Sequence, residues 1–183
     1  MKRPFLFALV WAFCAWPLQC ATLERLSLDD MITKSTAIVR AKVTGSYAAY
    51  SGRLIYTHYA IQVSEQFKGG SQGTMDVAAP GGTVNHVRQT VAGAPEFQTG
   101  DEYVFFLWTS KSGLTQVIGL TQGLFAIPAG TSADPVATRT ASGELMLAHG
   151  SGAPVKNQTL VMKVSELRSR IAATLAAAGS NAQ

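Results

Sequence analysis

The sequence predicts a mainly β protein: a small antiparallel β-barrel with a short N-terminal helix and a C-terminal helix. Three observations support this prediction. Apolar and polar residues alternate along several short segments, as in strands with one buried face. Pairs of glycine or proline residues separate many of these segments. Only two segments, one near each end, carry helix signals, and a barrel would remove the exposed edges that so many strands create.

Residues 1–20 have the pattern of a secretory signal peptide. Lys2 and Arg3 form a positively charged start, and an apolar run follows over residues 4–16. This run is shorter than the about 20 residues that a membrane-spanning helix needs. We therefore predict an exported bacterial protein, periplasmic or extracellular, with no stable membrane anchor once the signal is removed.

Cleavage is expected after Cys20, and cleavage after Ala21 is the alternative. Attachment of a lipid to Cys20 is a second alternative, although Gln19 is bulky where such a motif has a small residue. We expect free export of a single domain over residues 21–178, followed by a short tail over residues 179–183.

The charge balance of the exported part argues against a nucleic-acid partner. The full chain has 15 basic and 11 acidic residues, and Lys2 and Arg3 are lost with the signal. The remaining basic residues form no cluster of the kind that grips phosphates. Both cysteines, Cys14 and Cys20, also fall in the signal segment. The domain is therefore expected to lack disulfides and to be stabilised by its core alone.

Two helices are predicted, each beginning at a serine. Ser27 is expected to cap a helix over residues 28–34, because two aspartates then lie in its first turn. Ser165 is expected to cap a helix over about residues 165–177. An apolar stripe along that helix consists of Leu167, Ile171 and Leu175.

Alternation and turn signals predict the strands. Residues 103–108 are apolar on both faces, which places this strand at the centre of the core. Residues 45–52 are predicted to form a connector and residues 83–99 a loop, because glycine and proline interrupt them. The other predicted strands are residues 37–43, 55–64, 74–79, 114–120 and 124–127, and a hairpin of residues 136–140 and 144–147.

The order of three short motifs resembles a known family. The motifs are Thr36–Val43, the strand 55–67 followed by Lys68-Gly69, and Thr99–Val104. Over residues 36–120 this order resembles the netrin-like modules, which include the inhibitory domain of the tissue inhibitors of metalloproteinases. The resemblance implies a five-stranded OB-like barrel and an exported protease as a protein partner. The whole chain also resembles small exported proteins of bacteria.

Two features of those inhibitors are missing from this sequence. The inhibitors are cross-linked by disulfides, which this domain lacks. They also begin on a cysteine that chelates the protease zinc, which here would require cleavage between Gln19 and Cys20. Because a shared fold does not by itself carry function, the resemblance implies the kind of fold more firmly than it implies inhibition.

We predict no catalytic residues, no metal site and no cofactor. The histidines His58, His86 and His149 do not stand near one another, or near a carboxylate, at the spacing of metal ligands. The chain has no nucleophile elbow, dinucleotide motif or phosphate-binding loop. His149 lies beside Gly150-Ser151-Gly152, which leaves a small exported hydrolase as an alternative function.

The leading hypothesis is a secreted or periplasmic binding module without enzymatic activity. OB-type barrels bind ligands through loops at one end and one sheet face, and tyrosine and arginine side chains often anchor interfaces. The predicted partner-binding residues are Tyr47, Tyr50, Tyr56, Pro80, Gly81, Gly82, His86 and Arg88. The alternative interpretation is that the tyrosines fill the barrel mouth. A third alternative function is an accessory structural component of the cell envelope.

Overall fold

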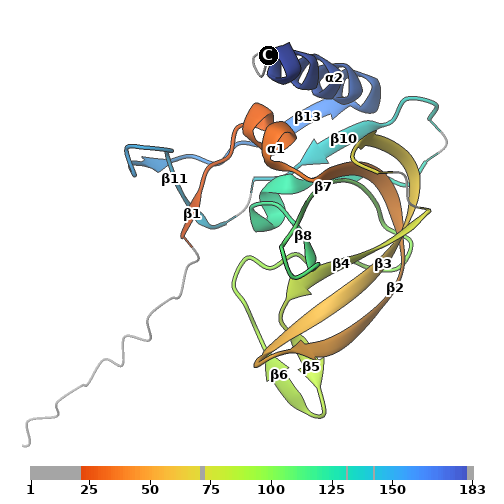
Figure 1. The fold of residues 1–183 in the computed structure, drawn as a ribbon, viewed down its shortest axis with the longest axis vertical. Helices are drawn as coiled ribbons and strands as arrows, with labels where there is room; N and C mark the ends of the chain where they lie inside the picture. Colours follow the sequence, from red (N-terminus) through yellow and green to blue (C-terminus); the bar gives the residue numbers. More distant parts are fainter. Residues whose placement is uncertain (1–21, 71–72, 131, 142, 181–183) are drawn as a thin grey trace, which may run out of the picture.

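The computed structural model describes residues 22–70, 73–130, 132–141 and 143–180. Within these residues the protein is mainly β, with two α-helices and one short 3-10 helix, as predicted (Figure 1). The predicted signal peptide and the last three residues of the predicted tail lie outside the described residues.

Helix α1 (Leu28–Lys34) begins as predicted at Ser27. The Ser27 hydroxyl accepts the backbone N–H of Asp30 at 3.0 Å, and the Asp30 carboxylate accepts the N–H of Ser27 at 3.2 Å. This capping box satisfies two N–H groups that the helix itself cannot. At the other end, Lys68 Nζ donates to the carbonyl oxygens of Ile32 and Thr33. The short helix is thus held at both ends.

Strands β2 (Ala37–Ser51) and β3 (Leu54–Lys68) form one long antiparallel hairpin. The predicted connector over residues 45–52 is wrong, because most of it continues β2 and only Gly52 and Arg53 form the turn. The small residues there resemble a loop in sequence. Pairing with β3 supplies the backbone hydrogen bonds, and a register shift between Val43 and Gly45 lets the strand bend.

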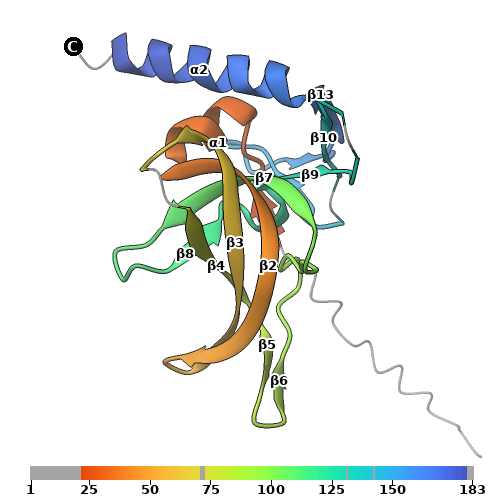
Figure 2. The same cartoon turned by 90° about the vertical axis from the view of Figure 1, so that its right-hand side faces the viewer.

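The large sheet has eight strands and is strongly curled. Its order is β13 (Leu160–Lys163), β10 (Val136–Arg139), β9 (Leu124–Ile127), β7 (Glu102–Thr109), β2, β3, β4 (Thr74–Pro80), with β8 (Thr115–Val117) on the same edge of β7 as β9. The curl brings β4 near β8 (Figure 2). No ladder joins these two strands within the described residues, so the sheet is not closed and the predicted OB-like barrel is not confirmed.

Both faces of the sheet centre are buried, as predicted for residues 103–108. Val104, Phe105, Phe106 and Leu107 of β7 are all fully buried. Phe105 and Leu107 point into the curl, where one apolar cluster lies. Val104 and Phe106 point to the opposite face, where a second cluster packs beneath the helices. The period of two therefore divides β7 between two cores.

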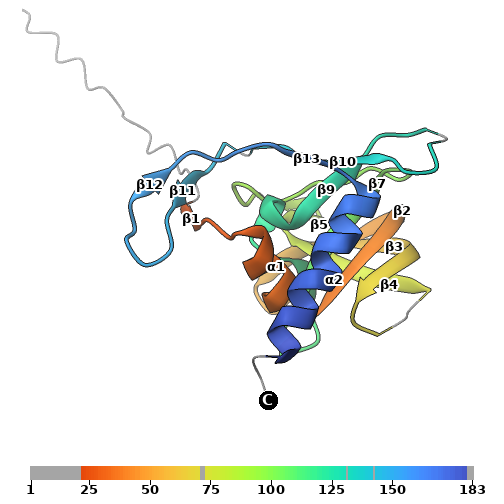
Figure 3. The ribbon, with the colours of Figure 1, turned by 90° about the horizontal axis from the view of Figure 1, so that it is seen from above.

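Helix α2 (Val164–Ser180) covers the second cluster (Figure 3). The predicted stripe is confirmed: Leu167 and Ile171 are buried and Leu175 packs partly against them. The predicted cap is wrong: the helix begins at Val164, and Ser165 lies in its first turn, where its N–H and hydroxyl donate to the carboxylate of Asp134. The helix runs to Ser180, beyond the predicted end near residue 177. Arg170 pairs with Asp29 of α1 at 2.7 Å, which joins the two helices.

A small sheet of β1 (Thr22–Glu24), β11 (Leu145–Leu147) and β12 (Pro154–Val155) lies beside the large one. The predicted hairpin of residues 136–140 and 144–147 is wrong. Strand β10 pairs with β9 and β13, whereas β11 pairs in parallel with β1. A local turn signal suggested one hairpin, but the two strands belong to different sheets: β10 lies between β9 and β13, and β11 lies between β1 and β12. The predicted strand 114–120 is shorter, because the 3-10 helix η1 (Leu120–Gly123) follows β8.

Candidate binding surface

Two hairpins project side by side from the end of the molecule opposite α2 (Figure 2). One is the tip of β2–β3, and the other is β5 (Gly82–Val84) with β6 (Val87–Gln89). We call residues 46–58 and 82–89 together the hairpin end. Four of the eight large hydrophobic side chains that are exposed in the described residues lie here: Tyr47, Tyr50, Leu54 and Val87.

The β5–β6 hairpin lies in the segment that was predicted to be a loop. Val84 pairs with Val87, and Asn85 and His86 between them both have positive φ. A two-residue turn with positive φ matches the right-handed twist of the flanking strands, and Asn and His tolerate this backbone better than most residues. The exposed His86 is thus a turn residue at the tip. It is not among the residues that line the pocket of Arg88.

Tyr47 and Tyr56 lie on the outer face of the β2–β3 hairpin, together with His58. The Tyr47 ring stacks on the His58 ring, with centroids 4.9 Å apart and 9° between the planes. His58 Nδ1 contacts Asp76 Oδ2 of β4 at 2.8 Å. The Tyr47 side of this row is open, because 57% of that residue is exposed. The row offers a flat aromatic surface next to a carboxylate.

Tyr50 points to the opposite face. Its cross-strand neighbour is Ile55, which is buried on the inner face, whereas the neighbour of Tyr47 is His58. Side chains an odd number of positions apart on a regular strand point to opposite faces. The predicted tyrosine group is therefore divided between the two faces of the hairpin.

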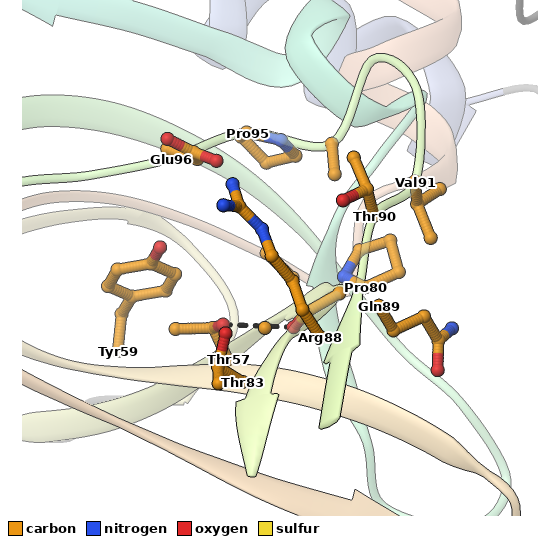
Figure 4. Close-up of a pocket in the computed structure, with 14 residues that line it drawn as sticks. Thr57, Tyr59, Pro80, Thr83, Arg88, Gln89, Thr90, Val91, Pro95 and Glu96 are labelled. Atoms are coloured by element: carbon orange, nitrogen blue, oxygen red, sulfur yellow. Dashed lines mark hydrogen bonds between the residues drawn. The ribbon is translucent and has the colours of Figure 1, made fainter. Parts of the chain in front are cut away.

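Four of the predicted residues line one pocket: Pro80, Gly81, Gly82 and Arg88 (Figure 4). The cavity measures about 210 Å³. It lies between the ends of β3 and β4, the β5–β6 hairpin and residues 90–96. Thr57 shapes its floor, because the Thr57 hydroxyl donates to the carbonyl oxygen of Gly81 at 2.9 Å.

Gly82 is required where β4 passes into β5. Its φ is +138°, and a Cβ at this position would lie 2.6 Å from Thr57 Oγ1. A side chain here would meet both an unfavourable backbone conformation and a steric contact. The glycine thus allows β5 to lie directly against the β2–β3 hairpin, which positions β6 at the pocket.

Two opposite charges line this pocket without pairing. In Figure 4, the Arg88 side chain reaches from β6 toward Glu96. Within the described residues no ion pair joins them, and the Arg88 guanidinium has no hydrogen-bond acceptor. Tyr59 lines the same cavity. Burial raises the pKa of its hydroxyl, and the charge of Glu96 raises it further.

The hydrolase alternative is not supported by a catalytic arrangement. His149 Nδ1 contacts Glu24, but no hydrogen bond joins His149 to the Ser151 hydroxyl in the described part of the chain. Ser151 Oγ instead accepts the backbone N–H of Ala153 at 3.4 Å. Among the described residues, no three His, Cys, Asp or Glu side chains gather as metal ligands would.

Several residues at these places were not singled out from the sequence. Asp76 lies 18 positions from His58, and the relation of Glu96 to Arg88 depends on the path of the irregular segment 90–96, so no spacing rule connects them. His58 was set aside as a metal ligand and was not included among the predicted binding residues, yet it lies between Tyr47 and Asp76. Its position two residues from Tyr56 on an alternating strand was the one available signal.

No family model, curated protein or solved structure matches this chain. No helix in the described segments is long and apolar enough to cross a bilayer. We therefore infer function from the geometry of this surface.

Proposed function

We propose that this chain is an exported, non-enzymatic binding module whose hairpin end docks on a protein partner. The observation that carries the proposal is the concentration of exposed apolar side chains on two adjacent hairpins. Exposed apolar residues that lie on one face often mark interaction sites, and Tyr47 and Leu54 lie on the same face of the β2–β3 hairpin. Arg53 is the only formally charged residue in segment 44–64, and Arg88 is the only one in segment 77–95. These charges favour a partner surface with carboxylates.

The proposal includes an OB-like, netrin-like arrangement of β2, β3, β4, β7 and β8. The approach of β4 to β8 and the order of these strands support it. Barrels of this kind bind ligands through loops at one end and one sheet face, which is consistent with docking through the hairpin end. An exported protease is the partner that the resemblance suggests, and this part rests on analogy.

Export is part of the same proposal. The charged start and apolar run of residues 1–20 support it. The mass of the protein recovered from outside the cytoplasm should correspond to a chain that begins at Ala21. A retained N-terminus, or a lipid on Cys20, would contradict free export.

Photo-crosslinking tests the docking surface. A photoreactive phenylalanine derivative replaces Tyr47 in one exported variant and Val161 in another. Val161 is 62% exposed on β13, away from the hairpin end, so it is a matched control. A protein crosslinked at position 47 and not at 161 is then purified. The affinity of the purified partner for the Tyr47→Ala variant should be at least about tenfold lower than for the wild type, and its affinity for the Val161→Ala variant should be unchanged.

Two results would overturn the proposal. One is equal crosslinking at both positions, which would indicate non-specific contact. The other is unchanged affinity in both Tyr47→Ala and Leu54→Ala, because these side chains are central to the exposed surface. If the captured partner is a protease, its activity with and without the wild-type chain tests inhibition directly.

A further inference from the structure

The pocket of Arg88 and Glu96 offers recognition chemistry of its own. Arginine is always charged at physiological pH. Its hydrogen bonds are strongest when the acceptor is an anion such as a carboxylate. The Arg88 guanidinium has none among the described residues, although Glu96 lines the same cavity. The cavity is therefore lined by one positive and one negative side chain, both exposed to solvent and not paired with each other.

The size of the cavity limits what fills this space. About 210 Å³ is below the roughly 300–1,000 Å³ of pockets that hold drug-sized ligands. A single amino-acid residue is of suitable size, whereas a nucleotide or a large cofactor is not. Pro80, Val91 and Pro95 give the walls an apolar part, and Thr83 and Thr90 add hydroxyl groups.

We infer that this pocket binds the C-terminal residue of a peptide chain, with the terminal carboxylate on Arg88 and the N–H of the same residue on Glu96. The two planar N–H donors of a guanidinium match the two oxygens of a carboxylate. A carboxylate alone would be repelled by Glu96. A C-terminal residue instead carries an amide N–H a few bonds from its carboxylate, so it satisfies both charged groups.

The apolar walls favour a small aliphatic side chain on the terminal residue. Gly81 and Gly82 contribute only backbone atoms to the lining. This inference rests on the proposed function, because it names the part of the protein partner that the hairpin end would hold. The pocket can nevertheless be tested without the partner.

The test is a titration of the purified exported chain by NMR. The probes are N-acetyl-Ala-Ala, its C-terminal amide, free alanine and acetate. N-acetyl-Ala-Ala should shift the backbone amide signals of Gly81, Gly82 and Thr90, and its amide should bind at least about tenfold more weakly. Arg88→Gln should weaken binding of the free acid at least about tenfold, and Arg88→Lys should retain part of it.

Arg53→Gln is the matched control, because it removes the same charge from the same end of the molecule. It should leave binding within about twofold. Glu96→Gln should weaken the binding of N-acetyl-Ala-Ala. The binding of acetate should be unchanged or tighter, since acetate has no N–H to donate. Circular dichroism of each variant checks the fold. Arg88→Gln should not alter it, because the Arg88 side chain makes no hydrogen bond or ion pair among the described residues.

Four results would overturn the inference. They are equal binding of acid and amide, equal effects of Arg88→Gln and Arg53→Gln, tighter binding of free alanine than of the acetylated peptide, and no shift at about 10 mM peptide. Failure here would leave the crosslinking result at Tyr47 intact. Conversely, if the peptide binds but no protein crosslinks at position 47, the proposed peptide site stands and the proposed docking surface is rejected.

Discussion

The side-chain oxygen of Gln122 accepts the backbone N–H of Leu26 at 2.9 Å, although the two residues are 96 positions apart. Gln122 Nε2 donates to the carbonyl oxygen of Glu24, also at 2.9 Å. The Gln122 side chain is buried in the 3-10 helix η1. One amide group thus ties the segment that leads from β1 into α1 to the large sheet.

Gln122→Ala should destabilise this attachment. The substitution leaves the Leu26 N–H without its partner, and an unsatisfied buried donor costs about 1–3 kcal/mol. We expect a loss of that size in urea unfolding, with faster hydrogen exchange at Leu26. Gln116→Ala is the control, because the Gln116 side chain makes no hydrogen bond among the described residues. Equal losses in both variants would show that Gln122 is not a special anchor.

Gly82→Ala should destabilise the protein by about 1–3 kcal/mol, since the added Cβ meets Thr57 Oγ1 at 2.6 Å on a backbone with φ +138°. Gly45→Ala is the comparison, because a Cβ there meets nothing within 4 Å and the φ of Gly45 is not positive. Thermal unfolding of both variants measures the difference. A Gly82→Ala protein as stable as Gly45→Ala would contradict the described path of the chain into β5.

Tyr103 should make the protein sensitive to alkaline pH. Burial, with the hydrogen bond to Asp101 and its charge, raises the pKa of Tyr103 to about 12. The folded state therefore holds a proton that the unfolded state releases near pH 10. This contribution is complete below pH 10 and is lost as the pH rises toward 12. Urea unfolding between these values should show a steeper loss for the wild type than for Tyr103→Phe.

The control for this pH dependence is Tyr50→Phe, because Tyr50 is exposed. Burial also raises the pKa of Tyr59. Some loss of stability at alkaline pH should therefore persist in Tyr103→Phe. Identical pH profiles for the wild type and Tyr103→Phe would contradict the assignment to Tyr103.

Arg139→Met should leave stability unchanged or raise it by up to about 2 kcal/mol. Arg139 is buried on β10 over the ring of Phe125, at 6.0 Å from the centroid, and its Nη1 has no hydrogen-bond partner in the described residues. Burial lowers the pKa of Arg139, and the charge of Arg25 lowers it further. Replacing a buried charge without a counterion by an apolar side chain of similar length removes a desolvation cost.

Chemical unfolding measures this change, with Arg168→Met as the comparison. Arg168 is an exposed partner of Glu65, and its loss should cost at most about 1 kcal/mol. A loss well beyond that value for Arg139→Met would mean that Arg139 stabilises the fold through its charge.

The elements that follow from local residues were predicted well. The capping box of α1 depends on Ser27 and Asp30, which are three positions apart. The centre of β7 was predicted because a strand that is apolar on both faces must be covered on both. The errors occurred where pairing is not local. The β5–β6 hairpin has three-residue strands, too short for a visible alternation, and its turn is recognised only from the backbone at Asn85 and His86.

The residues of the predicted site lie in separate places in the structure. Pro80, Gly81, Gly82 and Arg88 do line one pocket, whereas Tyr47 and Tyr50 point to opposite faces. A three-residue separation gives this result on a strand, but the segment was interpreted as a connector. Glu96 was not anticipated, because its relation to Arg88 depends on the path of residues 90–96 back over the hairpin.

By itself the sequence determined the mainly β character, the capped start of α1, the buried centre of β7 and the apolar stripe of α2. These features depend on residue type and on spacing within a few positions. Only the tertiary structure decided that β11 pairs with β1, that β4 stops short of a ladder with β8, and that Arg88 and Glu96 share one cavity. The physical reason is that each of these arrangements depends on which distant segments pack together, and a one-residue change of register would alter the face on which every side chain lies.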